Sequence, residues 1–194
     1  MNLGDKMATK VIAIIGKSAS GKDTFYRHLK GRFDFNFIVS HTTREPRPNE
    51  KDGVDYFFTS KEDFEKKIKE GLFLETNIFN NWYYGISKEV FKNDTINMVV
   101  IDPAGYKKLK EIFGDENTLG IHIKTPLFIR IKRYIKRDGC FKFEVIRRII
   151  ADFKDFKKVD KLSNTYILKG TRHLAYNEEI FKEVVNKWIE NTLD

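Results

Sequence analysis

Two short stretches of the sequence carry residues whose types and spacing suit the handling of phosphate groups. The first, IIGKSASGKDT (14–24), fits the pattern G-x-x-x-x-G-K with Gly16, Gly21 and Lys22. Glycines let the backbone curl so that successive amide N–H groups point at one anion, and a helix that begins there adds its partial positive charge. Lys22 can then reach the outer phosphates of a nucleoside triphosphate. The predicted ATP-binding loop consists of Gly16, Lys17, Ser18, Ala19, Ser20, Gly21, Lys22, Asp23 and Thr24.

Asp23 departs from the usual loop, in which a Ser or Thr at this position ligates Mg²⁺. A carboxylate is also a hard oxygen ligand for Mg²⁺, and Thr24 offers a hydroxyl one residue further on. We therefore expect the substitution to change how the metal is held without abolishing nucleotide binding. Mg²⁺ is the predicted cofactor, and Asp23 and Thr24 are its candidate ligands. The alternative for this loop is a Gly-rich turn between a strand and a helix that binds nothing.

The second stretch, SHTTREPRPNEKDGVDYFF (40–58), places two arginines beside prolines that stiffen the turn between them. Arg44 and Arg47 are three residues apart, and two guanidinium groups can grip one phosphate through paired hydrogen bonds. Tyr56 and, further along, Tyr84 add phenol donors. A single arginine is more often a solvated surface charge, but this set accompanies a phosphate loop. The stretch therefore predicts a second anion site.

Short apolar runs that alternate with helical patterns must position these two stretches. Such alternation predicts right-handed strand–helix–strand units and a parallel sheet of about five strands. The interval from about Ser40 to Ser87 breaks the rhythm and predicts an inserted subdomain. The expected strands are KVIAIIG, FDFNFIVS, NMVVID, GIHIK and TYILK.

Start signals and helical spacing of apolar residues predict the helices. One begins after Gly21, and a capping-box-like pair, Ser60 and Asp63, begins another. Thr125, followed by Pro126 at the first helical position, predicts a third, and the last starts near Asn177. The expected apolar sides are Phe25 and Leu29; Phe64 and Ile68; Leu127, Ile131 and Ile135; and Phe181, Val184, Val185, Trp188 and Ile189.

The composition bounds the class of protein. The chain has 194 residues, of which 41% are hydrophobic, enough to bury a core, and no apolar run approaches the length of about 20 residues that spans a bilayer. The net charge of +8 suits phosphate-bearing ligands but also describes lysines on solvated faces. Cys140 is the single cysteine, which excludes an intrachain disulfide and favours a cytoplasmic location. Residues 1–9 are expected to form a disordered leader without a signal-peptide core.

Several of these motifs, in this order, resemble the guanylate kinase family. They are HTTREPRP…DGVDYFF, F…GLFLE and YYG, and the match runs from Val11 to about Arg148. The resemblance implies an α/β fold of the three-layer P-loop NTPase type, with a mostly parallel core sheet, an inserted NMP-binding subdomain and a lid. We expect a core of residues 10–36, 89–132 and 151–194, an insert of residues 37–88 and a lid of residues 133–150.

The resemblance also implies the acceptor site. Ser40 and Glu75 stand where the family reads guanine, and a carboxylate suits the adjacent N1–H and 2-amino donors of that base. Adenine has no donor at N1, so Glu75 would be left unpaired. Asp102 matches the second acid of a D-x-D pattern in the family. The implied GMP-binding residues are Ser40, Arg44, Arg47, Tyr56, Glu75, Tyr84 and Asp102.

The basic stretch from Arg130 to Arg148 holds eight positive residues and agrees with the arginine-bearing lid of the family. Phosphoryl transfer needs charge neutralisation and exclusion of water, and a closing segment can supply both. An RNA-binding helix or a solvated face is the alternative, but no RNA-binding module is legible, so we expect no nucleic-acid partner. The candidate catalytic residues are Lys22, Arg44, Arg133, Arg137 and Arg148.

Two further departures from the family pattern lie near the acceptor site. Ile86 follows YYG where the family has Ser or Thr, so one base contact is missing unless Ser87 replaces it. Val100 replaces the first acid of the D-x-D pattern. The loss of this acid, together with the gain of Asp23, suggests that metal coordination has moved between these elements.

The predicted activity is that of a nucleoside monophosphate kinase, the ATP-dependent phosphorylation of GMP or dGMP. The expected partners are ATP and GMP or dGMP, with no membrane, in a monomer or homodimer. One alternative is a kinase of the same fold that acts on another nucleotide or on a ribose phosphate. A non-catalytic binding module of the same family is the other, and it is disfavoured because such modules typically lose the loop lysine and the lid arginines.

Overall fold

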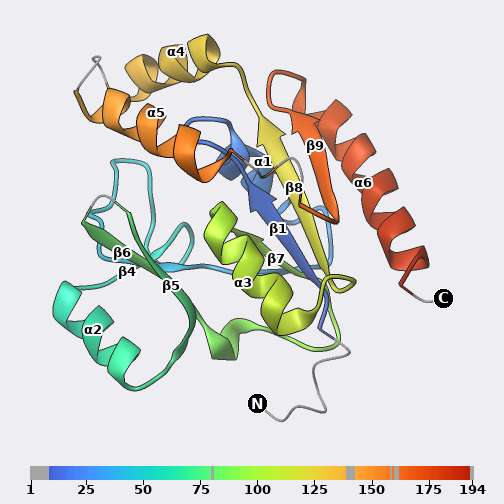
Figure 1. The fold of residues 1–194 in the computed structure, drawn as a ribbon, viewed down its shortest axis with the longest axis horizontal. Helices are drawn as coiled ribbons and strands as arrows, with labels where there is room; N and C mark the ends of the chain where they lie inside the picture. Colours follow the sequence, from blue (N-terminus) through green and yellow to red (C-terminus); the bar gives the residue numbers. More distant parts are fainter. Residues whose placement is uncertain (1–8, 80, 139–142, 158, 160–161, 193–194) are drawn as a thin grey trace.

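Five parallel strands form the centre of the protein (Figure 1). The computed structural model describes residues 9–79, 81–138, 143–157, 159 and 162–192. Neighbouring strands pair in parallel throughout this sheet, as expected when helices connect them. The predicted α/β fold with a mostly parallel sheet is therefore confirmed. The strand order is β2 (Asn36–Phe37), β7 (Asn97–Val100), β1 (Val11–Ile15), β8 (Thr118–Lys124) and β9 (Thr165–Lys169).

Strand β1 is buried on both faces because helices cover the sheet on both sides. Its residues alternate between two hydrophobic clusters. One cluster packs against α1 (Lys22–Leu29) and α6 (Leu174–Glu190), and the other packs against α3 (Pro103–Phe113). Figure 1 shows α3 and α6 on opposite sides of the sheet, which completes three layers.

The predicted strand FDFNFIVS is mostly irregular, and only Asn36 and Phe37 form β2. Phenylalanine nevertheless recurs at every second position from 33 to 37, and all three side chains are partly buried. Phe33, Phe35 and Phe37 all pack against the cluster beneath α6, and the ring of Phe33 meets that of Phe181 edge-on at 5.3 Å. Aromatic packing therefore explains the pattern without a long hydrogen-bonded strand.

A second, four-stranded sheet lies below the helices α4 (Leu127–Asp138) and α5 (Phe143–Asp155) in Figure 1. Helix α2 (Lys61–Lys69) packs on it, and Ser60 caps this helix as predicted, with its hydroxyl accepting from the Asp63 N–H at 3.0 Å. Phe64 is fully buried and stacks on Phe73, but Ile68 is 40% exposed, which contradicts its predicted burial. The strand order is β4 (Phe57–Phe58), β3 (His41–Thr42), β6 (Trp82–Ser87) and β5 (Phe73–Phe79); a 3₁₀ turn, η2 (Lys88–Val90), leads back to the core.

Helices α4 (Leu127–Asp138) and α5 (Phe143–Asp155) form a hairpin near the carboxyl ends of the central strands (Figure 1). The predicted apolar side of α4 is wrong: Leu127 and Ile135 are exposed, whereas Arg130 and Tyr134 are buried. The reason is that α4 packs against the phosphate loop, where polar backbone groups favour an arginine. Spacing alone does not reveal such a polar partner.

Two predicted helix starts also differ. Helix α6 begins at Leu174, earlier than predicted, and His173 is its N-cap. Helix α4 begins at Leu127, one residue after Pro126, and the hydroxyl of Thr125 donates to the carbonyl of Ser20 at 2.7 Å. Thr9, expected at the end of the leader, is fully buried, and its hydroxyl donates to Asn93. Thr9 is therefore not part of a disordered leader, and residues 1–8 of the predicted leader lie outside the described part.

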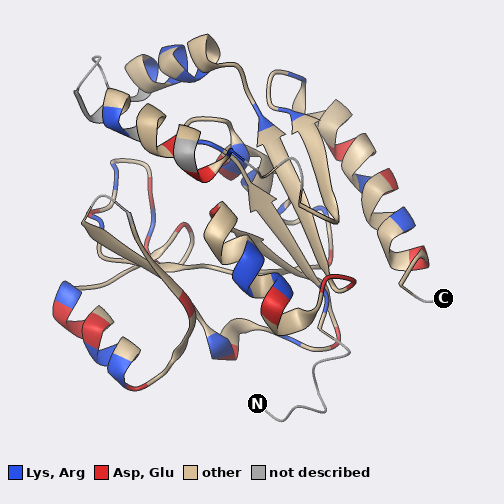
Figure 2. Cartoon of the chain, in the orientation of Figure 1, with Lys and Arg blue, Asp and Glu red and all other residues tan. Residues whose placement is uncertain are grey.

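Helices α2, α3 and α6 each carry charges of both signs (Figure 2). This arrangement fits the interpretation of most lysines as solvated surface groups. None of the described helices combines the length and the apolar character needed to cross a membrane.

Candidate functional site

The phosphate loop joins β1 to α1 at the carboxyl edge of the central sheet. Gly21 has φ 101° at the N-cap of α1, a left-handed conformation that glycine adopts without strain. The Ser20 N–H donates to the Lys17 carbonyl at 3.0 Å, so the loop curls tightly. A helix of eight residues therefore begins with its free N–H groups facing the loop, which is the arrangement that binds anions.

A buried ion pair holds the loop from behind. Arg130 and Asp152, on α4 and α5, pair with each other and are 2% and 5% exposed. The Arg130 Nη1 donates to the Ser18 carbonyl at 3.1 Å, and the Ser18 N–H donates to Asp152 Oδ1 at 3.2 Å. Both backbone groups of one loop residue are thus fixed by the hairpin. The sequence does not reveal this role, because Arg130 stands among many cations of the same stretch.

Replacing Asp152 by Ala is expected to lower the free energy of unfolding by about 3 kcal/mol, because Arg130 would remain buried without its partner. Urea unfolding of the purified variant measures this loss. A double variant, Arg130→Met with Asp152→Ala, removes both charges and is expected to recover part of it. A double variant no more stable than Asp152→Ala would contradict this explanation.

Among the three predicted lid arginines, the structure describes the complete side chain of Arg133. Its Nη1 donates to the Ser20 carbonyl and its Nη2 to the Gly170 carbonyl, both at 2.7 Å. It thus lies against the outside of the phosphate loop, next to Gly21. The side chains of Arg137 and Arg148 lie outside the described part of the structure.

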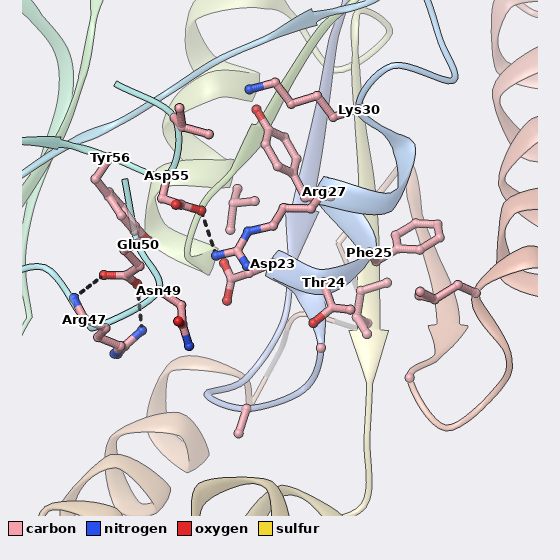
Figure 3. Close-up of a pocket in the computed structure, with 18 of the residues that line it drawn as sticks. Asp23, Thr24, Phe25, Arg27, Lys30, Arg47, Asn49, Glu50, Asp55 and Tyr56 are labelled. Carbon is pink, nitrogen blue, oxygen red and sulfur yellow. Dashed lines mark hydrogen bonds and ion pairs between the residues drawn. The ribbon is translucent and has the colours of Figure 1, made fainter. Parts of the chain in front are cut away.

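The second predicted anion site is built around a carboxylate that has no place in the sequence-based prediction. Glu50, whose side chain is 8% exposed, accepts two hydrogen bonds from Arg44 Nη2, at 2.9 and 2.8 Å. It also accepts from the backbone N–H and the Nη1 of Arg47, at 2.9 and 3.2 Å (Figure 3). Glu50 therefore brings the two predicted phosphate-binding arginines together. Its place three residues after Arg47 is the signal that was available in the sequence.

The tyrosines predicted for this site are adjacent to Arg44. Its guanidinium carbon lies 5.4 Å from the centre of the Tyr56 ring, and the rings of Tyr56 and Tyr84 are 6.1 Å apart. Burial, together with the negative charge of Asp23, raises the pKa of Tyr56 above its ordinary value. Its hydroxyl therefore stays protonated at neutral pH and can donate a hydrogen bond.

Two cavities connect the loop with this site. The larger, of about 740 Å³, reaches from α1 past Arg133 to Gly170, and the smaller, of about 230 Å³, reaches to Glu75 and Asp102. Their common walls show that they adjoin. The residues that line both are Ala19, Asp23, Ser40, Arg47, Tyr56 and Val100.

Asp23 lies where the two cavities meet, and its side chain is 55% exposed to them, 3.6 Å from the Lys22 ammonium. Partial removal of the carboxylate from water by the walls of the cleft acts to raise the pKa of Asp23. The positive charges of Lys22, Arg47 and Arg27 outweigh this effect, so the pKa lies below its ordinary value. Arg27 in turn pairs with Asp55 at 2.7 Å across the larger cavity (Figure 3). Asp23 is thus an ionised carboxylate open to solvent between the two anion sites. Thr24 also lines the larger cavity.

Glu75 and Asp102 form an acidic end of the smaller cavity, beside the N-terminus of α3. The Gly105 N–H donates to Asp102 Oδ1 at 2.8 Å, so Asp102 caps α3. Burial, with the nearby charge of Asp102, raises the pKa of Glu75 to about 7. Ile86 is buried in the wall of this cavity, and Ser87 does not line either cavity. The structure thus does not place Ser87 where the missing hydroxyl would act.

Comparison with known proteins agrees with this geometry. The family model described as guanylate kinase matches residues 8–170. A guanylate kinase of Malacoplasma penetrans (strain HF-2) is 37% identical over 164 residues, which cover 81% of this chain and 82% of that protein. One from Helicobacter pylori (strain ATCC 700392 / 26695) is 30% identical over 177 residues, covering 89% of this chain and 81% of that protein.

A crystal structure of guanylate kinase from Anaplasma phagocytophilum has the same fold, with a TM-score of 0.68 at 20% identity over 96% of this chain and 90% of that one. Together, the family match over most of the chain and the similarity of the curated relatives identify the protein class. The chain belongs to the guanylate kinase family.

Proposed function

We propose that this protein transfers the γ-phosphoryl group of ATP to GMP or dGMP, giving ADP and the guanosine diphosphate. The observation that carries the proposal is the continuity of the two anion sites. The glycine loop with Lys22 and the pair Arg44–Arg47 line adjoining cavities that share Asp23, Arg47 and Tyr56. A phosphoryl group passes between two bound nucleotides only when such sites face each other at close range.

In this mechanism the loop amides and Lys22 hold the β- and γ-phosphates of ATP. Arg44, Arg47, Tyr56 and Tyr84 hold the phosphate of GMP, which is already an anion and needs no general base to attack. Ser40 and Glu75 read the base, and Asp102 helps to orient the acceptor. The transferred group carries negative charge throughout, so fixed cations supply most of the stabilisation of the transition state. Arg133, Arg137 and Arg148 add positive charge from the hairpin.

The residues present fit Mg²⁺. The ion is commonly held by one or two carboxylates together with substrate phosphates, and the described residues contain no cluster of three His, Cys, Asp or Glu side chains that would hold it alone. The ionised, open carboxylate of Asp23 is such a ligand, and the hydroxyl of Thr24 is the second candidate. When bound, the ion would neutralise charge on the phosphates of ATP.

A panel of nucleoside monophosphates tests the proposal. ADP release from ATP is measured with GMP, dGMP, AMP, CMP, UMP and a ribose phosphate as acceptors. We expect GMP or dGMP to be preferred by at least about a hundredfold in kcat/KM, because another base leaves the Glu75 carboxylate unpaired. Preference for another acceptor would favour the same-fold alternative, to which Ile86 lends some support, and absence of transfer with nucleotide binding retained would favour a binding module.

The pKa of Glu75 predicts how GMP binding depends on pH. Guanine donates two hydrogens to this carboxylate, which accepts both only when ionised, so the KM for GMP is expected to rise by about fivefold from pH 7 to pH 6. Because the folded-state pKa is raised, the same group lowers the free energy of unfolding as the pH rises from about 4.5 to 7.

The phosphate of GMP also titrates near pH 6, so Glu75→Gln serves as the control. It keeps the phosphate titration and removes that of Glu75. Steady-state KM values for GMP and ATP between pH 5.5 and 8.5 give the comparison. If the wild type and Glu75→Gln show the same pH profile for GMP, Glu75 is not the group that titrates.

A further inference from the structure

The face of the second sheet that lines the smaller cavity carries four side chains in two cross-strand pairs. Glu75 on β5 is opposite Ile86 on β6, and Asn77 is opposite Tyr84. Residues two apart on a strand lie on the same face, so Glu75 and Asn77 project toward the same cavity. Glu75, Ile86 and Tyr84 all have a place in the site described above. Asn77 does not.

Asn77 contacts the acidic end of the cavity directly. Its side-chain Nδ2 donates to Asp102 Oδ2, while the other oxygen of Asp102 accepts from the Gly105 N–H. A carboxylate only accepts hydrogen bonds, so the amide nitrogen of Asn77 must face Asp102 and its oxygen is turned away from that bond. Position 77 thus supplies a hydrogen-bond acceptor in a fixed orientation.

Glu75 lies beside this pair. Its carboxyl carbon would be 3.3 Å from a Cβ added to Gly105, the residue whose N–H holds Asp102. Glu75, Asp102 and Asn77 therefore surround one place at the N-terminus of α3. The opposite member of the Glu75 pair, Ile86, is apolar and 2% exposed, so it offers no hydrogen bond there.

Guanine has more hydrogen-bond donors on one edge than the Glu75 carboxylate can accept from. The Watson–Crick edge presents N1–H and a 2-amino group with two hydrogens, and one carboxylate pairs with N1–H and the nearer amino hydrogen. The remaining amino hydrogen needs an acceptor, since a buried unpaired donor costs binding free energy. Hypoxanthine, the base of IMP, has N1–H but no 2-amino group.

We propose that Asn77 is a specificity residue for the acceptor base, whose amide oxygen, oriented by the bond to Asp102, accepts the 2-amino hydrogen of guanine that Glu75 leaves unpaired. This proposal rests on the proposed function and adds a reader of the 2-position to it. Asn77 then discriminates GMP from IMP, whereas the gripping of the phosphate and the recognition of N1–H remain with the residues already named.

The test compares kcat/KM for GMP and for IMP in the wild type and in Asn77→Ala. Loss of one hydrogen bond to a neutral donor is expected to lower the GMP-to-IMP ratio by about tenfold, with the value for IMP changed less than about threefold. Asn77→Leu, which keeps the volume but not the amide, is expected to give the same result. Thr76→Ala, at the neighbouring exposed position, is the matched control and should leave the ratio unchanged.

An unchanged ratio in both Asn77 variants would overturn the proposal, as would an equal loss with both substrates. Loss of folding in both variants, seen as absent thermal unfolding transitions, would show a structural role for Asn77 and would overturn it too. A wild-type protein inactive with GMP would instead refute the proposed function. The two failures are therefore distinguishable.

Discussion

Replacing Lys22 by Ala is expected to lower kcat for phosphoryl transfer from ATP to GMP by about a thousandfold. Lys22 is the first residue of α1, where the phosphate loop ends, and it lines the smaller cavity beside Asp23. Its ammonium group can stay in contact with the negative charge of the phosphoryl group while that group is transferred. The measurement is steady-state kinetics at saturating ATP and GMP, with GMP binding by calorimetry to show that the acceptor site survives.

Lys108→Ala is the control for Lys22→Ala, because Lys108 is a solvated lysine on α3 that pairs with Glu111 on the surface. Its removal should leave kcat within about twofold, since exposed pairs contribute little. Activity of Lys22→Ala within tenfold of the wild type would contradict the assignment of the loop as the donor site.

Replacing Arg44 by Ala is expected to lower kcat/KM for GMP by about a thousandfold and to destabilise the fold as well. The guanidinium of Arg44 is 5% exposed and forms a two-bond contact with Glu50. Its loss removes a cation from the phosphate site and leaves Glu50 with Arg47 alone. Kinetics with varied GMP, and thermal unfolding, give the two readouts.

A second substitution separates the two effects of Arg44. Arg44→Ala combined with Glu50→Ala is expected to regain part of the stability, because the buried carboxylate is removed with its partner. It should not regain activity. An Arg44→Ala protein with unchanged kcat/KM for GMP would refute the role of Arg44, and a KM for ATP that rises as much as that for GMP would show a general distortion instead.

The sequence predicted the central sheet and the phosphate loop well, because both follow local rules. The β-branched run that precedes Gly16 is fully buried, and α1 begins directly after Gly21, as the spacing from Gly16 to Lys22 predicts. The same holds for Ser60 as a helix cap. These predictions depend on a few consecutive residues, and no distant partner alters them.

Other features depend on contacts that the sequence does not show. Arg130 stands among the cations of the basic stretch, but Asp152 and the backbone of Ser18, both far from it in the chain, stabilise its burial. Asn77 likewise contacts Asp102, 25 positions away. Glu50 lies only three and six residues from the two arginines that it binds, but this spacing alone does not show that the three side chains meet.

The proposed mechanism requires that the loop around Lys22 and the arginine pair around Arg44 bind two nucleotides end to end. A bisubstrate compound, adenosine and guanosine joined through five phosphates, tests it most directly by calorimetry and by competition kinetics. We expect competition with both ATP and GMP and an affinity at least about a hundredfold higher than that of either nucleotide. Competition with only one of them, or an affinity no higher than that of GMP alone, would contradict it.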